Sequence, residues 1–154
     1  MTTLNKLLMV STAAMSLMAC ATPVQSLYDA EVDRLCALDG GLKIYETVEL
    51  SPEHFNRYGQ LTHLRPSKGE YALGPDYRYV HRFDYLRGTP GGLGEATLTK
   101  RSLAIYRRSD GKLLGSSVAY SRGGGAIPGP WHPSSYTCPN NLQSLETQIF
   151  VPQR

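Results

Sequence analysis

LAIYRRSDGKLLGSSV, residues 103–118, is the stretch of sequence that decides the fold. Its centre, Asp110-Gly111, favours a two-residue type I′ turn between two antiparallel strands. Such a turn places Ser109 opposite Lys112, and the pairs that follow by counting are Leu103 with Val118, Ile105 with Ser116 and Arg107 with Leu114. The hairpin is therefore expected to present one mainly apolar face, with small residues on the reverse face.

Another strand is predicted over residues 77–86, where the side chains alternate in type. One side carries Tyr77, Tyr79, His81, Phe83 and Tyr85, and the other carries Arg78, Val80, Arg82, Asp84 and Leu86. Alternation with period two is typical of a strand, and aromatic residues are favoured in strands. We expect one face of this strand to be strongly aromatic.

A helix followed by a strand is predicted upstream of these elements. Ser26 is a suitable N-cap, apolar residues follow at helical spacing, and Gly40 ends the helix. Residues 42–49 then alternate as a strand. Ser51-Pro52-Glu53 opens a short second helix that ends by residue 59, because proline is favoured at the first helical position and an acid in the first turn.

The last segment, residues 142–151, fits two patterns. Leu142, Leu145 and Ile149 have helical spacing, whereas Leu145, Thr147, Ile149 and Val151 have strand spacing. We interpret this segment as a final strand. Together these elements predict an α+β fold with a mostly antiparallel sheet of about four or five strands, an N-terminal helix and one short helix.

The N-terminus has the layout of an export signal. Residues 1–6 carry one positive charge, and residues 7–19 are almost entirely apolar. The run Leu17-Met18-Ala19-Cys20 resembles the lipobox of bacterial lipoproteins. This resemblance implies cleavage before Cys20 and attachment of lipid to its thiol. Residues 1–19 are then the signal peptide, residues 20–25 a lipidated tether and residues 26–154 a single domain. An ordinary secretory signal cut at Ala19-Cys20-Ala21 and an uncleaved membrane anchor are the alternatives.

The lipobox resemblance also implies a location. In Gram-negative lipoproteins an aspartate after the lipidated cysteine signals inner-membrane retention, and Ala21 stands there instead, so we expect a lipid anchor in the outer membrane, facing the periplasm. The block Asp39-Gly40-Gly41 with residues 44–47, together with residues 128–133, is similar to small uncharacterised lipoproteins of proteobacteria, a likeness that brings no activity with it.

Cysteine usage fits that compartment. One of the three cysteines is assigned to lipid, which leaves Cys36 and Cys138 as a pair for a disulfide in an oxidising periplasm. Two separately buried thiols are the alternative. The four histidines show no metal-binding spacing, and a formal net charge of +3 gives no argument for nucleic acid. We expect no cofactor and no metal.

The sequence contains three candidate catalytic pairs, and none has suitable geometry. His81 and Asp84 point to opposite faces of their strand. Glu53 and His54 are adjacent on a helix and do not face each other, and His132 with Ser134 or Ser135 lies in a Gly/Pro loop without a nucleophile motif. We therefore expect no catalytic activity.

A non-catalytic protein-interaction or structural role in the envelope is the expected function. Residues 123–138 form a long irregular segment, and Trp131, His132 and Tyr136 are its candidate partner surface. The alternative is that Trp131 covers the core as a lid. Ligand or glycan binding through the aromatic strand, and a small cell-wall hydrolase, are the other functions that the sequence leaves open.

Overall fold

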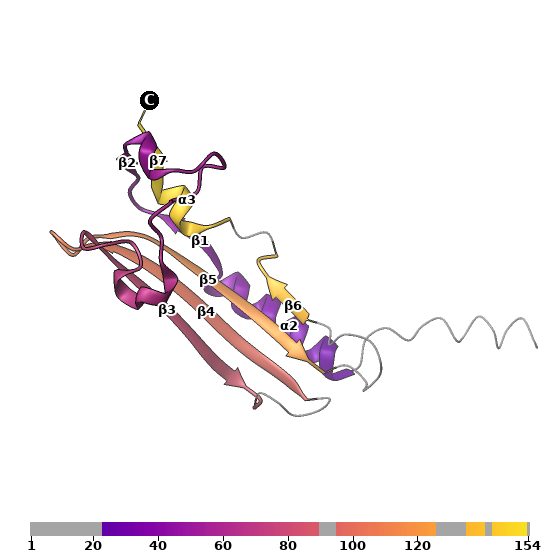
Figure 1. Cartoon of the computed structure of the whole chain (residues 1–154). Helices are drawn as coiled ribbons and strands as arrows, with labels where there is room; N and C mark the ends of the chain where they lie inside the picture. The colour runs from indigo at the N-terminus through magenta and orange to yellow at the C-terminus, as the bar shows by residue number, and fades with distance from the viewer. Residues whose placement is uncertain (1–22, 90–94, 126–134, 141–142, 154) are drawn as a thin grey trace, which may run out of the picture.

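The computed structural model describes residues 23–89, 95–125, 135–140 and 143–153. Within this part of the chain, five strands form one antiparallel sheet: β1 (Gly41–Ile44), β5 (Leu113–Gly124), β4 (Ala96–Arg107) and β3 (Tyr77–Arg87) in that order, with β6 (Ser135–Cys138) also paired to β5. β1 pairs with the first half of β5 and β6 with the second half, so both lie at the same edge. β3 forms the opposite edge (Figure 1). The predicted α+β fold is confirmed.

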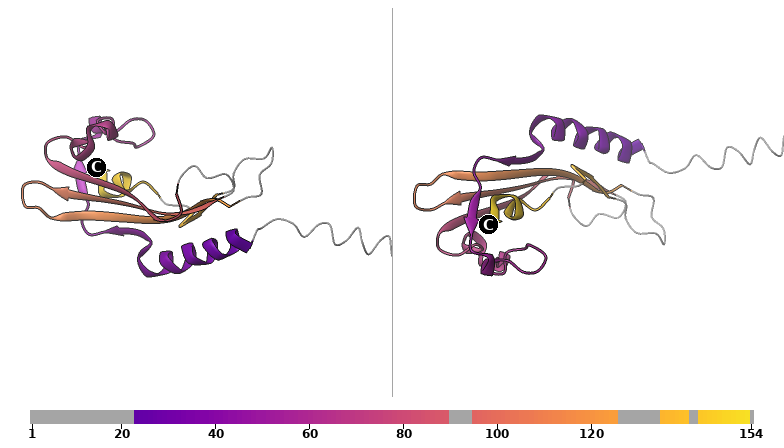
Figure 2. Two further views of the ribbon diagram at one scale, coloured as in Figure 1. Left: turned by 90° about the horizontal axis from the view of Figure 1, so that it is seen from below. Right: turned by 90° about the horizontal axis from the view of Figure 1, so that it is seen from above.

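Two different layers cover the two faces of the sheet (Figure 2). α2 (Pro23–Asp39) lies along one face. The other face carries α3 (Leu145–Ile149), the 3-10 helix η2 (Pro66–Tyr71) and a parallel pair formed by β2 (Val48–Leu50) and β7 (Phe150–Pro152). A second 3-10 helix, η1 (Pro52–His54), follows β2.

Each face of the sheet therefore has its own core. On the α2 side the buried residues are Val32, Leu98 and Tyr120. On the α3 side they are Leu73, Ile105, Leu114, Leu145, Ile149 and Phe150. Burial of these side chains is the main stabilising contribution. Successive side chains of β4 point to opposite faces of the sheet, so this strand contributes Leu98 to one core and Ile105 to the other.

The strands of the predicted hairpin are present, but its turn is not the predicted one. The amide of Arg107 donates to the carbonyl of Lys112 at 2.9 Å, so residues 108–111 form a four-residue loop in place of two. Gly111 occupies the left-handed region there, with φ +70°. Asp110 accepts from the Lys112 amide at 3.0 Å, an Asx-type contact that favours this longer loop.

The predicted register is also wrong, because β5 contains one extra residue. Tyr106 pairs with Leu113 and Ile105 with Gly115, which leaves Leu114 unpaired with β4 in a β-bulge. Leu103 consequently lies opposite Ser117 instead of Val118. A slip of one residue moves a side chain to the other face, so Val118 contacts the α2 core while Ile105 lies in the α3 core.

Residues 42–49 do not form the single predicted strand. The chain leaves β1 after Ile44 and enters β2 at Val48, in a different sheet. The amides of Tyr45 and Glu46 both donate to the Leu114 carbonyl, at 2.8 and 3.1 Å. The Leu114 carbonyl, at the bulge in β5, thus accepts the hydrogen bonds that hold the chain where it passes from β1 to β2.

Three other predicted boundaries are corrected. The N-terminal helix begins at Pro23, three residues before the predicted cap at Ser26, because proline fits the first helical position. The short helix after Ser51 is the single 3-10 turn η1. The final segment is not one strand: α3 precedes β7, and the helix buries Leu145 and Ile149 as its helical spacing allows.

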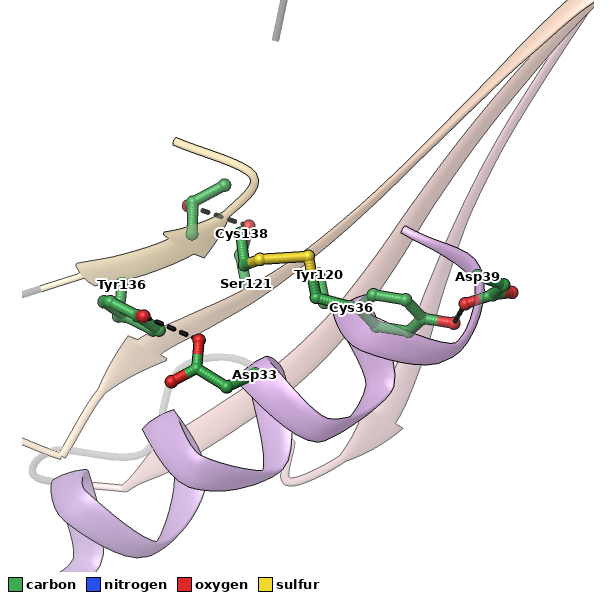
Figure 3. The surroundings of a disulfide bond; sticks show 8 residues. Asp33, Cys36, Asp39, Tyr120, Ser121, Tyr136 and Cys138 are labelled. Atoms are coloured by element: carbon green, nitrogen blue, oxygen red, sulfur yellow. Dashed lines mark hydrogen bonds between the residues drawn. A yellow bond between two sulfur atoms is a disulfide. The ribbon is translucent and has the colours of Figure 1, made fainter. Parts of the chain in front are cut away.

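The predicted disulfide joins Cys36 of α2 to Cys138 of β6, with the two Cα atoms 6.0 Å apart (Figure 3). Beside it, the Tyr136 hydroxyl donates to Asp33 at 2.7 Å and the Tyr120 hydroxyl donates to Asp39 at 2.6 Å. α2 is therefore tied to the second half of β5 and to β6.

Ionic contacts fix both ends of α2 to the sheet. Near its start, the buried Arg122 guanidinium lies 2.6 Å from Asp29. At its end, Lys100 binds Asp39 at 2.8 Å, and the Lys100 and Tyr120 hydrogen bonds lower the pKa of Asp39. In the described part of the chain, no helix combines the length and the apolar character that spanning a membrane requires.

Candidate binding surface on strand β3

β3 has a free edge along most of its length. Its eleven residues pair with β4 on one side, and no other strand of the described residues pairs with it. An edge strand presents unpaired N–H and C=O groups that a further strand can bind. This makes β3 the part of the sheet most able to form intermolecular main-chain hydrogen bonds.

The aromatic face of β3 passes from core to surface along the strand. Tyr77 packs edge-on against Phe150, with ring centroids 4.8 Å apart, and Tyr79 also packs against the α3-side core. Phe83 and Tyr85 are 52% and 50% exposed, and their rings pack edge-on at 5.2 Å. Phe83 and Tyr85 are exposed because α3, β7 and η2 cover only the first half of this face (Figure 1).

A cavity of about 210 Å³ lies between the sheet and the start of α3. Its floor contains Glu146, which is 6% exposed and accepts hydrogen bonds from Ser144 and Tyr79. Burial, and then the neighbouring Glu146 carboxylate, raise the pKa of Tyr79 above its ordinary range. The phenol therefore keeps its proton and serves as a donor to Glu146.

An arginine and a histidine border the mouth of this cavity. Arg101 lies opposite Phe83 in the sheet, and His81 lies opposite Leu103. Arg101 is exposed and makes no ion pair with any described residue. An unpaired guanidinium beside an exposed aromatic ring can bind a carboxylate or stack on a further ring.

A second hollow runs beside the edge of β3. It has a volume of about 490 Å³ and is lined by Pro66, Gly69 and Glu70 of η2 and by residues 79–82 of β3. η2 therefore flanks the first half of the edge and leaves space next to it. The second half, from residue 83 onward, carries no such flanking element (Figure 1).

The opposite face of β3 carries Arg78, whose guanidinium lies over the Tyr106 ring, and two further charges of opposite sign, Arg82 and Asp84. Arg82 lies across from Ser102, and Asp84 lies across from Lys100, whose ammonium already binds Asp39. Both side chains are exposed, and neither forms an ion pair among the described residues. Leu86, 42% exposed, follows at a bulge in the β3–β4 pairing.

The three pairs that the sequence analysis considered and rejected as catalytic are not brought together in the described part of the chain. His81 and Asp84 point to opposite faces of β3, as their spacing requires. His54 lies next to His63, with ring centroids 5.3 Å apart, and not against Glu53. His132 lies outside the described residues. Among the described residues, no group of three or more His, Cys, Asp or Glu side chains is arranged to hold a metal.

The predicted partner surface is described only at Tyr136. Its hydroxyl donates to Asp33 of α2, so this side chain helps to hold β6 in place and is 36% exposed. Trp131 and His132 lie outside the described residues, as does Cys20, the predicted lipidation site. The partner surface at residues 131–136 therefore stays a prediction.

Sequence reasoning identified the aromatic face of β3 but missed several residues around it. Glu146 lies in the segment that the sequence predicts as a strand, and no local sequence pattern indicates that its carboxylate is buried. Arg101 is placed beside Phe83 by the β3–β4 register, which the sequence does not specify. Alternation places Arg82 and Asp84 on one face of the strand, but it does not indicate that they lack ion-pair partners among the described residues.

No family model matches this chain, and the comparisons with curated proteins and with solved structures find no similar protein.

Proposed function

We propose that this protein is a lipid-anchored, non-catalytic component of the bacterial envelope that binds a protein partner along β3. The observation that carries the proposal is the open second half of β3, where a free strand edge lies between exposed apolar side chains on both faces. Strand addition at such an edge supplies main-chain hydrogen bonds for affinity and alternating side-chain contacts for specificity.

The side chains at this edge suit a protein partner. Phe83, Tyr85 and Leu86 are large apolar residues exposed by 42 to 52%. Aromatic residues and arginine are enriched in interfaces, and Arg82 and Arg101 have no ion-pair partner among the described residues. Contact with a partner would bury the aromatic pair and provide counter-charges.

The proposed anchor places this surface close to the bilayer. Cys20 is three residues before the start of α2, a distance that a fully extended chain spans in about 11 Å. α2 starts at the same end of the sheet as the second half of β3, where Arg87 lies 4.0 Å from Glu31. The partner would therefore bind near the membrane surface.

Photocrosslinking in the native cell tests the proposal. A photoreactive residue at Tyr85 is expected to capture a discrete protein in the membrane fraction. The matched control is Tyr58, a more accessible tyrosine that is 69% exposed in the loop between η1 and η2. Identical products from both positions, or no protein product from Tyr85, would contradict the proposed function.

Glycan binding is a second candidate, favoured by the position of the aromatic pair next to a polar cavity. Phe83 and Tyr85 form a ring surface, and Arg101, His81 and Ser117 border the cavity beside it. Titration with soluble peptidoglycan fragments tests this function. Chemical-shift changes confined to these residues would support it, and unchanged spectra would eliminate it.

A further inference from the structure

Building on the proposed function, we infer that the partner at β3 is a second copy of this chain, paired antiparallel about a two-fold axis at Phe83. Closed two-fold pairing is the commonest form of protein self-association, and it requires a surface that is complementary to itself. The second half of β3 has this property in its charges, in its apolar side chains and in its open edge.

The charges select the register. With the axis at Phe83, Arg82 lies opposite Asp84 of the second copy, and Asp84 lies opposite Arg82 of the second copy. Both pairs lie on the face that carries α2, where Arg82 and Asp84 have no ion-pair partner within their own described chain. Opposite charges directly across two strands are stabilising, and like charges are destabilising.

Neighbouring two-fold registers are less favourable. An axis at Arg82 or at Asp84 places two like charges directly opposite each other. An axis at His81 would pair Asp84 with Arg78, but the Arg78 guanidinium lies over the Tyr106 ring, 4.5 Å from its centroid. That register would also move the added strand further toward η2, which flanks the first half of the edge.

The aromatic face supports the same register. Phe83 would meet its own copy at the axis, and His81 would lie opposite Tyr85 on either side. Aromatic pairs across strands contribute to sheet stability, and the exposed ring surface of Phe83 and Tyr85 would be covered. Val80 would lie opposite Leu86 on the other face, at the point where the hollow beside η2 provides space.

Cysteine crosslinking measures the register directly. Directly opposite residues in an antiparallel pair have Cα atoms about 4.5 to 5.5 Å apart, which is within disulfide range. Phe83→Cys is therefore expected to form a disulfide-linked dimer on mild oxidation. Tyr85→Cys is the matched control. With the axis at Phe83, residue 85 of one copy and residue 85 of the other are offset by four residues along the strands, which is about 13 Å. A stronger crosslink from Tyr85→Cys, or none from either variant, would overturn the inference.

Charge reversal provides an independent measurement in solution. The chain from residue 20 onward, with Cys20→Ser to prevent lipidation, retains every described element and is studied by sedimentation equilibrium. Arg82→Asp or Asp84→Arg alone is expected to raise the dimer dissociation constant at least tenfold, which corresponds to about 1.4 kcal/mol. The double variant Arg82→Asp/Asp84→Arg restores both pairs and should return the constant to within threefold of the original.

Arg78→Asp is the matched control, since it reverses a charge on the same face outside the proposed pairs and should leave the constant unchanged. Circular dichroism confirms that each variant is folded. A monomer at every accessible concentration, or a double variant as weak as the single ones, would refute self-pairing. If the purified chain is monomeric while Tyr85 still captures a different protein in cells, the inference fails and the proposed function stands.

Discussion

Removal of the Cys36–Cys138 disulfide should destabilise the protein by an amount set mainly by the unfolded chain. The two cysteines are 102 residues apart in sequence, and the chain-entropy model gives about 4.7 kcal/mol for a loop of this length. The folded state should change little, because α2 keeps its contacts through Val32, through Asp29 with Arg122 and through Asp39 with Lys100.

Urea unfolding of the oxidised and the reduced protein, followed by circular dichroism, measures this difference. We expect the free energy of unfolding to fall by about 3 to 5 kcal/mol on reduction, with the native spectrum retained in the absence of urea. Cys36→Ala/Cys138→Ala is the control that separates loss of the crosslink from effects of the reductant. A decrease below about 1 kcal/mol would refute the entropic argument, and loss of helical signal before unfolding would show that the crosslink itself holds α2.

Three further perturbations test the anchor, the α3-side core and the half-buried His63. Cys20→Ser should abolish membrane association, and persistence in carbonate-washed membranes would contradict the lipobox assignment. Gly115→Ala places a Cβ 2.9 Å from the Ile149 Cδ1 atom and 3.1 Å from the Leu145 Cδ1 atom, so thermal unfolding should show a loss of about 1 to 3 kcal/mol; unchanged stability would mean that α3 moves without cost. The pKa of His63 is lowered from 6.5 by its burial and by the neighbouring His54 and Arg65 side chains. As the pH falls below 6.5, the unfolded chain therefore binds a proton before the folded chain does, and the free energy of unfolding decreases. His63→Gln should flatten that decrease in urea midpoints between about pH 6.5 and 5, and an unaltered slope would assign it to other groups.

The sequence predicts those elements whose side chains alternate or repeat without interruption. β3 follows its alternation from Tyr77 onward, and α2 ends before Gly40 as predicted. The hairpin strands are also predicted, but their register depends on one extra residue, Leu114, whose carbonyl binds the amides of Tyr45 and Glu46. A long-range contact thus determines the bulge, and local turn preferences cannot indicate it.

The sequence predicts which aromatic side chains share a face of the candidate site, but not which of them are exposed. Alternation placed Phe83 and Tyr85 on one face with Tyr77 and Tyr79. Which of these rings is covered depends on where α3 and β7 pack, and the final segment fitted helix and strand equally well. The sequence does not predict β6, because this strand has only four residues and its pairing with β5 depends on tertiary contacts.

The unequal edges of the sheet limit how many molecules can assemble. On the side away from β3, the outermost strands in the described residues are β1 and β6, each four residues long and paired to successive halves of β5. Short edge strands are poor templates for further pairing, so polymer growth would terminate after one addition at β3. The disulfide fastens β6 to α2. A reduced molecule that released β6 would expose the backbone of residues 120–123 of β5, and the sheet would then have a second edge open to pairing.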